Sequence, residues 1–302
     1  MTPTPADIES TDVEFFSDGT RIAAELFTPG DSARRAPAIV IAHGFGGIKS
    51  FFVADIARAI SAAGFISLTF DYRGFGESAG PRNRLRPLEQ VADIRAGCDF
   101  LRTLPNVDPD RIGIYGTSFG GGLAIAAAAG DPRVRAAVCA VGISDYGRWL
   151  RSLRRHWEWI AFEHRLEADR TRRLLTGVSE VVEPEVIMVR DPESEKHEQY
   201  LRENWPDRAF QLDLASADAI IEFKSIDYAN ALGDKALLLI GVDEDGLTPY
   251  DHTLDLYAAA SGPKELISLT GMSHHDIYQP QRRDGLMEQV IAFLQQKVAL
   301  EA

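Results

Sequence analysis

The sequence predicts an α/β fold, a sandwich in which helices cover both faces of a mostly parallel sheet of about eight strands. Short apolar runs alternate with helix-like stretches along most of the chain, which is typical of βαβ units. With 302 residues, 45% of them hydrophobic, the chain is long enough to bury a large core. One long stretch interrupts the alternation and indicates an inserted structure.

The apolar runs that we expect to form strands are residues 12–16, 21–27, 38–43, 65–70, 111–115, 134–141, 236–241 and 265–269. A short turn with Asp18 and Gly19 separates the first two, so these two should form an antiparallel hairpin. Helical patterns fall at about 51–63, 87–104, 118–130, 250–260 and 285–298. They supply the crossovers that parallel strands need.

The interrupting stretch, residues 145–228, is far too long for a connection, since the median loop has about 4–6 residues. We interpret it as a helical lid inserted into a core domain of residues 1–144 and 229–302. Four tryptophans lie in it: Trp149, Trp157, Trp159 and Trp205. Open α/β sheets bind ligands at the carboxyl ends of their strands, where this insertion begins. The first three tryptophans are therefore candidates for a substrate pocket, and the alternative is that they form the core of the lid.

Composition excludes some classes of function. The 45 acidic and 32 basic residues give a net charge of −13, which disfavours nucleic acid as a partner. No leader and no apolar run of about 18 residues is visible, so we expect a cytoplasmic protein without a membrane span. Cys98 and Cys139 have no metal-binding spacing and are expected to be buried. The sequence leaves open whether the chain forms a homo-oligomer.

Residues 113–121 read GIYGTSFGG and contain the pattern G-x-S-x-G around Ser118. An apolar strand is expected before the pattern and a helix of small residues after it, which is the context of a nucleophile on a sharp strand-to-helix turn. Gly116 and Gly120 would let strand and helix cross closely. The alternative is a patch of glycine and serine that caps a helix.

A serine nucleophile needs a base within hydrogen-bonding reach and an acid that orients the base. In this architecture the acid and then the histidine follow the serine, each in a loop after a later strand. The loop after 236–241 reads VDEDGLTP and offers Asp243 or Asp245. The loop after 265–269 reads TGMSHHDIY and offers His274 or His275.

These motifs, with IAHGFGG (41–47) and FDYRGFGES (70–78), resemble the α/β-hydrolase superfamily over nearly the whole chain. The long lid and the ending SHHDIY are most similar to dienelactone-hydrolase-like and lidded serine esterases, including polyketide transferase-like relatives. Dienelactone hydrolase uses cysteine where this chain has Ser118, and epoxide hydrolases and haloalkane dehalogenases use aspartate. The chemistry of those enzymes therefore does not carry over.

The resemblance implies roles for particular residues. Asp245 stands four residues before Pro249, as in the acid turn of the family, and His274 fits the pattern H-x-D-x-Y. Asp243 and His275 stay as alternatives, since element boundaries are read to only about ±2–4 residues. The oxyanion hole would be formed by the backbone N–H groups of Phe45 and Phe119.

The expected activity is hydrolysis of carboxylic esters with an apolar portion, through an acyl-enzyme on Ser118. No cofactor is expected, and no metal, because the adjacent histidines lack further ligands at suitable spacing. Two other functions stay open. One is transfer of the acyl group to an alcohol or amine by the same residues, and the other is a non-catalytic binding protein on this fold.

Overall fold

The computed structural model describes residues 8–30, 35–204 and 210–300, and its centre is an eight-stranded sheet with the order β1-β2-β4-β3-β5-β6-β9-β10. All eight predicted strands are confirmed. They are β1 (Ile8–Ser17), β2 (Thr20–Pro29), β3 (Ala36–Ala42), β4 (Ile66–Phe70), β5 (Val107–Thr117), β6 (Val134–Ala140), β9 (Ala236–Val242) and β10 (Lys264–Leu269). The sheet is antiparallel between β1, β2 and β4 and parallel from β4 to β10.

The predicted hairpin joins β1 to β2. Its turn consists of Asp18 with φ 47° and Gly19 with φ 76°, two consecutive left-handed residues that suit the twist of a two-residue hairpin. Aspartate and glycine are among the residue types that adopt this conformation most readily. The turn therefore sets the register in which Ser17 faces Thr20.

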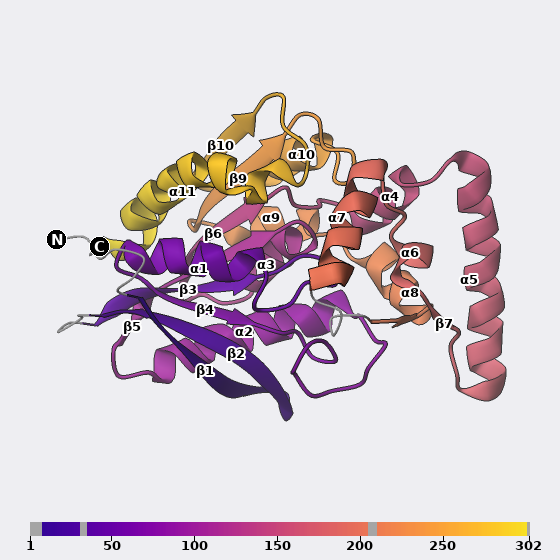
Figure 1. Cartoon of the computed structure of the whole chain (residues 1–302), viewed down its shortest axis with the longest axis horizontal. Helices are drawn as coiled ribbons and strands as arrows, with labels where there is room; N and C mark the ends of the chain where they lie inside the picture. Colours follow the sequence, from indigo (N-terminus) through magenta and orange to yellow (C-terminus); the bar gives the residue numbers. More distant parts are fainter. Residues whose placement is uncertain (1–7, 31–34, 205–209, 301–302) are drawn as a thin grey trace.

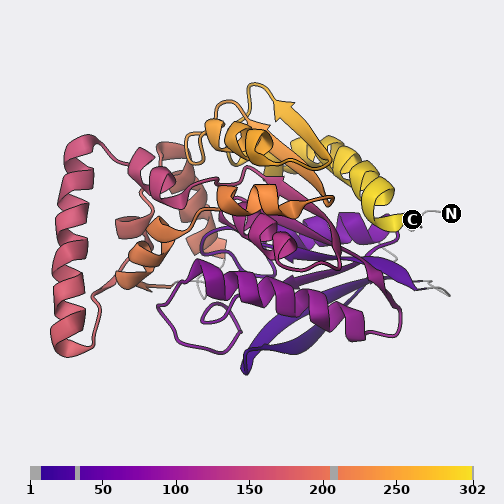
Figure 2. The same cartoon turned by 180° about the vertical axis from the view of Figure 1, so that it is seen from behind.

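Helices cover both faces of the sheet (Figures 1 and 2). One face carries α1 (Phe52–Ala62) and α11 (Pro280–Leu294), and the other carries α2 (Pro87–Thr103), α3 (Phe119–Ala129) and α10 (Asp251–Ala259). Alternate residues of β3 enter the two cores: Val40 belongs to the core under α2 and α3, and Ile39 and Ile41 to the core under α1. Because β3 is buried on both sides, it is apolar throughout.

The last helix differs from its prediction. It begins at Pro280, five residues before the expected start, and its end, η5 (Gln295–Ala299), is a π-helical turn. Proline is well suited to the first turn of a helix because the N–H group that it lacks would be unpaired there. Two short 3₁₀ turns, η3 (Asn230–Leu232) and η4 (Asp276–Tyr278), complete the core.

Residues 145–228 leave the sheet after β6 and return at β9 (Figure 1). The segment contains helices α4 (Tyr146–Ser152), α5 (His156–Thr176), α6 (Pro184–Ile187), α7 (Pro192–Asn204) and α8 (Ala215–Glu222), and α9 (Ile226–Ala229) begins in it and ends one residue beyond it. It also contains a two-stranded sheet of β7 (Val181–Val182) and β8 (Leu212–Asp213), which the sequence did not predict because two residues are too few to show alternation. No described helix has the length and apolar character needed to cross a membrane.

The turn from β5 to α3 is a tightly packed crossing of strand and helix. A Cβ atom on Gly116 would lie 2.3 Å from the carbonyl oxygen of Gly120, and one on Gly120 would lie 2.3 Å from that of His43. Both positions therefore require glycine. The predicted reason for the two glycines, a close crossing of strand and helix, is confirmed.

We expect Gly120→Ala to lower the free energy of unfolding by about 1–3 kcal/mol, because the added methyl group must displace the backbone at His43. Urea denaturation followed by circular dichroism would measure the change. Gly285→Ala is the matched control. No heavy atom lies within 4 Å of its Cβ position in α11, so it should gain about 0.5–1 kcal/mol from helix propensity. Equal effects of the two substitutions would contradict this account of the turn.

Candidate active site

Ser118 stands on the turn between β5 and α3, with φ 54° and ψ −126°. Few residues other than glycine adopt such angles, which cost about 1–3 kcal/mol, so the surrounding packing must hold them. The backbone N–H of Ser118 donates a 2.8 Å hydrogen bond to the carbonyl of Ala140 on the neighbouring strand β6. The sheet thus fixes the turn and presents the hydroxyl group at the carboxyl ends of the strands.

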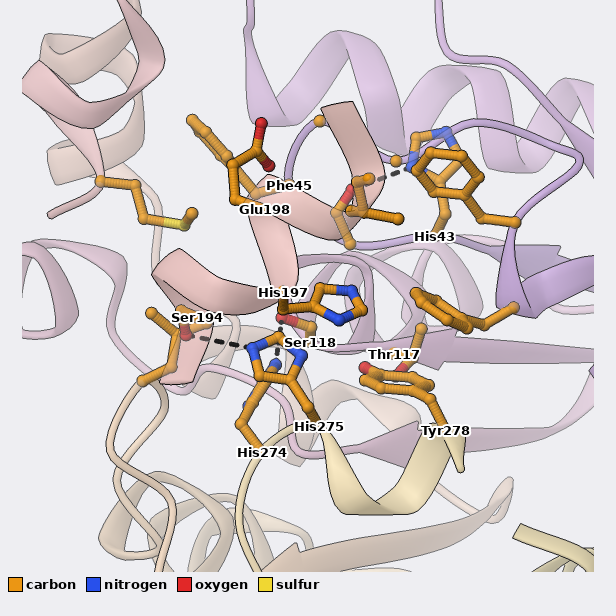
Figure 3. Close-up of a pocket in the computed structure, with 18 of the residues that line it drawn as sticks. His43, Phe45, Thr117, Ser118, Ser194, His197, Glu198, His274, His275 and Tyr278 are labelled. Atoms are coloured by element: carbon orange, nitrogen blue, oxygen red, sulfur yellow. Dashed lines mark hydrogen bonds between the residues drawn. The ribbon is translucent and has the colours of Figure 1, made fainter. Parts of the chain in front are cut away.

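The structure brings Ser118, His274 and Asp245 together in one hydrogen-bonded chain. His274 Nε2 lies 3.1 Å from Ser118 Oγ, and His274 Nδ1 lies 2.8 Å from Asp245 Oδ2. Figure 3 shows His274 beneath Ser118 at one side of the cavity. Asp243 is exposed and accepts a hydrogen bond from the backbone of Gly271 instead. Of the two acids, the structure places Asp245 against the histidine.

The carboxylate of Asp245 is stabilised in its charged form. It accepts hydrogen bonds from the backbone N–H groups of Leu247 (2.9 Å) and Thr248 (2.6 Å) and from Thr248 Oγ1 (2.8 Å). Burial raises the pKa of this carboxyl, but the charge of His274 and these hydrogen bonds outweigh burial and hold the pKa below its ordinary value of 3.8. Thr248 was missed as a site residue, although it lies in the quoted acid turn directly before Pro249.

The predicted oxyanion loop passes close to Ser118. A Cβ atom on Gly44 would lie 3.1 Å from Ser118 Cβ, so Phe45 follows a residue in contact with the serine. Phe119 is the first residue of α3, where backbone N–H groups have no partner within the helix. The rings of Phe45 and Phe119 lie 5.7 Å apart. Phe45 thus follows a loop residue that lies against Ser118, and Phe119 follows Ser118 directly in the chain.

His43, directly before Gly44 in this loop, has a structural role. Its Nδ1 donates a 2.9 Å hydrogen bond to the carbonyl of Gly44, and its ring meets that of Tyr72 edge to face at 4.6 Å. Burial lowers the pKa of His43 to about 4, so the ring is neutral near pH 7. This hydrogen bond holds the backbone of Gly44, the residue before Phe45.

A cavity of about 110 Å³ lies beside Ser118. Most of its wall is aromatic or aliphatic, and these lining residues include Phe45, Phe51, Phe52, Met188, Leu201 and Leu247. Met188 and Leu201 come from the inserted segment, and so do the two charged residues of the wall, Arg190 and Glu198. The insertion therefore forms one side of the cavity, and α7 is its main contributor.

The tryptophans are placed differently from our prediction. Trp149 is buried, packs 5.8 Å from the ring of Phe119 and donates a hydrogen bond to the carbonyl of Leu247. Trp157 is 63% exposed, and Trp159 packs on Phe162. None of these three lines the cavity, so their assignment to the substrate pocket is corrected. Trp205 lies outside the described residues. Composition alone did not show which face of each inserted helix turns toward the site.

His275 joins the histidine loop to α7. Its Nε2 lies 3.0 Å from Ser194 Oγ, and its ring stacks on that of His197 at 4.3 Å (Figure 3). Burial, followed by the neighbouring His274 and His197, lowers the pKa of His275 to about 2 and keeps the ring neutral. Sequence reasoning missed Ser194 and His197 because they lie about 80 residues earlier in the chain and in no recognisable motif.

The loop itself is anchored on its other side. Tyr278 Oη lies 2.6 Å from Thr117 Oγ1, directly before Ser118, and Asp276 accepts a hydrogen bond from the backbone of Ser273. Among the residues that the structure describes, no group of three or more His, Cys, Asp or Glu side chains is arranged to hold a metal ion.

Fold and site define an α/β hydrolase of the serine type. The structure matches the alpha/beta hydrolase GrgF from a Penicillium species with a TM-score of 0.82 and 22% identity, and the match covers 97% of this chain and 100% of that chain. At this identity the likeness concerns the fold. The α/β-hydrolase fold expected from the motifs is thereby confirmed.

The chain belongs to the X-Pro dipeptidyl-peptidase (S15) family, whose model matches residues 18–276. It is 32% identical over 244 residues to an uncharacterized 31.7 kDa protein of Escherichia coli, with 80% of this chain and 85% of that protein covered. It is also 28% identical over 308 residues to the polyketide transferase claH of Penicillium crustosum, with 96% and 98% covered. Further relatives carry the names of thiohydrolases and acyltransferases.

We expect Asp245→Asn to reduce the stability of the fold more at neutral pH than in acid. A carboxyl whose pKa is lowered by folding adds stability above its unfolded pKa and loses that contribution as the pH falls through the folded value. The difference in unfolding free energy between wild type and variant should therefore shrink below about pH 4. Urea unfolding of both proteins at a series of pH values measures it. A difference that stayed constant would show that the ionised carboxylate is not stabilised by folding.

Proposed function

We propose that the protein is a serine hydrolase that cleaves carboxylic esters through a covalent acyl-enzyme. The observation that carries the proposal is the continuous chain of hydrogen-bond distances from Ser118 Oγ through His274 to Asp245. A serine hydroxyl is a weak nucleophile until a neighbouring base accepts its proton, and a base is effective when an acid fixes its tautomer. The separations of 3.1 and 2.8 Å meet both requirements.

In the first half of the reaction, Ser118 Oγ attacks the carbonyl carbon of the ester while its proton passes to His274 Nε2. Asp245 stabilises the resulting imidazolium. The tetrahedral oxyanion accepts hydrogen bonds from the backbone N–H groups of Phe45 and Phe119. The bond to the leaving oxygen then breaks as His274 returns the proton to it, which releases the alcohol and leaves the acyl group on Ser118.

In the second half, water attacks the acyl-enzyme and gives a proton to the same histidine. A second tetrahedral oxyanion forms in the same hole, and its collapse breaks the bond to Ser118 Oγ, which takes the proton back. The carboxylic acid is released. The proton moves only between Ser118, His274, water and the leaving group, so the cycle balances with the groups named.

The wall of the cavity favours a small, apolar acyl group. Its aromatic and aliphatic residues enclose about 110 Å³ beside the serine, and such surfaces bind hydrocarbon by burial. The carboxylate of Glu198 in the wall lies 3.5 Å from Arg190 and 3.0 Å from Arg202, so its charge is already compensated. A dipeptidyl-peptidase substrate has a charged amino terminus, which would have to compete with these arginines. An ester has no such group.

Acyl transfer is the second candidate, and the name of the relative claH, a polyketide transferase, favours it. The acyl-enzyme is common to both reactions, and the acceptor that reaches it decides the product. Incubation with an ester and a competing alcohol, followed by mass analysis of the products, distinguishes them. A new ester as the main product would assign transfer, and the free acid would assign hydrolysis.

We also propose that residues 145–228 act as the lid that selects the substrate. Support comes from Met188 and from α7, which supplies Leu201, His197 and Glu198 to the cavity wall while the chemistry is assigned to residues of the core. The selecting residues would thus differ from the tryptophans that the composition suggested.

Ser118→Ala should leave the fold intact and lower kcat for para-nitrophenyl acetate by about four orders of magnitude or more, since the other two residues cannot form an acyl-enzyme. Labelling by a fluorophosphonate probe should disappear as well. Rates with an Xaa-Pro para-nitroanilide, measured in parallel, test the activity in the name of the family. If Ser118→Ala kept half of the wild-type ester rate, the proposed mechanism would be wrong.

His275→Ala and Asp243→Asn serve as controls for His274→Ala and Asp245→Asn. Removal of the base or of its orienting acid should cost about 10⁴ in kcat or more, because the three residues act as one unit. Among the described residues, no hydrogen bond joins His275 or Asp243 to Ser118 or His274, so each control should cost far less. If His275→Ala lowered kcat more than His274→Ala, His275 would be the base. If Asp243→Asn lowered it more than Asp245→Asn, Asp243 would be the acid.

Replacement of Met188 or Leu201 by alanine should shift the preference toward longer acyl chains, because each truncation removes part of the cavity wall. We expect the ratio of kcat/KM for a hexanoyl over an acetyl ester to rise about tenfold, the effect of roughly one to two buried methylene groups. Trp157→Ala removes an exposed side chain of the same insertion and should leave the ratio unchanged. Equal ratios in all variants would refute selection by this wall.

A further inference from the structure

The loop that carries the base is tied to the loop that carries the acid. The backbone N–H of Glu244 donates a 3.1 Å hydrogen bond to the carbonyl of Met272, and the backbone N–H of Gly271 donates a 2.8 Å bond to the carboxylate of Asp243. The contact between the base and its acid, described above, joins the same two loops. Several bonds therefore fix the base relative to the acid.

The serine belongs to a different part of the fold, the turn between β5 and α3. Within the described residues, two hydrogen bonds join this turn to the segment from Gly271 to Tyr278. One links His274 Nε2 to Ser118 Oγ, and it changes as the proton moves during the reaction. The other links Tyr278 Oη to Thr117 Oγ1 at 2.6 Å (Figure 3). This second bond can hold the base near the serine throughout the cycle.

Both partners of this second bond are buried and firmly placed. Thr117 is the last residue of β5, and its branched side chain has few accessible rotamers. Tyr278 ends the short turn η4, and its ring stacks on that of Phe52 in α1 at 4.9 Å. The backbone N–H of Tyr278 donates a 3.2 Å hydrogen bond to the carbonyl of His275. The tyrosine is thus connected to the residue that follows His274.

The hydroxyl group of Tyr278 is suited to holding and not to proton transfer. Burial raises the pKa of this side chain above its ordinary value of 10.0, although the bond to Thr117 lowers it, so the group stays protonated near neutral pH. The ring centres of Tyr278 and His274 are 6.2 Å apart. An effect of the hydroxyl group on the reaction would therefore act through the position of its neighbours.

The alternative is that the bond only stabilises the fold, since a buried tyrosine hydroxyl usually finds a partner. The place of the two residues in the chain favours a further role. Thr117 directly precedes Ser118 in the serine turn, and Tyr278 follows His274 by four residues in the histidine loop. The bond therefore connects the two segments whose side chains must meet for proton transfer.

We infer that Tyr278 is a positioning residue, whose hydrogen bond to Thr117 sets the distance at which His274 meets Ser118. The inference rests on the proposed function, because it gives Tyr278 a part in the same reaction. Proton transfer needs heavy atoms within about 2.6–3.2 Å, and the present separation of 3.1 Å is near the upper end of that range. A misplacement of about 1 Å can cost about 10²-fold in rate. Loss of the bond should therefore lower kcat more than it weakens binding.

Tyr278→Phe keeps the ring and removes the bond, so kcat for para-nitrophenyl acetate should fall about 10–100-fold, while KM changes less than about twofold. Thr117→Val should act in the same way, and Thr117→Ser, which keeps a hydroxyl group, should stay within about threefold of wild type. Tyr250→Phe is the matched control. It removes a hydroxyl group that pairs with Ser268 of β10, and neither residue lines the cavity, so kcat should not change. Equal kcat values for Tyr278→Phe and wild type would overturn the inference.

The double variant Tyr278→Phe with Thr117→Val separates positioning from stability. Each single change leaves a buried hydroxyl group without its partner, whereas the double change removes both groups. The urea midpoint of unfolding should therefore fall in the single variants and recover in the double variant, while kcat stays low in all three. Recovery of kcat together with stability would show that the bond only supports the fold, and the inference would be wrong.

The rate of labelling by a fluorophosphonate probe distinguishes this inference from the proposed function. The probe reports how well His274 activates Ser118, whatever the substrate of the protein. Slower labelling of Tyr278→Phe, combined with a wild type that hydrolyses no ester, would support the positioning role and refute ester hydrolysis. Equal labelling of Tyr278→Phe and wild type, with ester hydrolysis by the wild type, would refute the positioning role alone.

Discussion

The arrangement of the site depends on the close crossing of β5 and α3. Gly116 and Gly120 leave so little space between strand and helix that Ser118 is forced into a positive φ, and this conformation lifts the hydroxyl group above the carboxyl edge of the sheet. The acid and histidine loops end the neighbouring parallel strands β9 and β10 at the same edge. Parallel pairing therefore brings Ser118 and His274, which are 156 positions apart, within hydrogen-bonding distance.

Buried side chains near the site differ in charge because their surroundings differ. Asp245 is kept charged by donors and by His274, whereas burial keeps His43 and His275 neutral. As neutral rings, His43 contacts the backbone of Gly44 and His275 contacts Ser194 and His197 of α7. The charge of each of these side chains therefore depends on its surroundings and not on its residue type.

The sequence predicted the sheet and the serine turn because their signals are local: alternation of apolar residues, two glycines and the order of motifs along the chain. It narrowed the acid and the base to two candidates each, and only the resemblance to a known family chose between them. The tryptophans were assigned wrongly, and Ser194 and His197 were missed, because the face that an inserted helix turns inward depends on packing against distant residues. That packing leaves no periodic signal in the insertion itself.

The attachment of α7 to the histidine loop has a consequence for the order of events during turnover. Ser194 and His197 contact His275, and Glu193 accepts a hydrogen bond from Ser273, so the roof of the cavity shares its supports with the residue next to His274. Under the proposed mechanism, a displacement of α7 that widened the cavity would also remove these contacts from the loop of His274. The base would then be held least firmly when the cavity is most open to water.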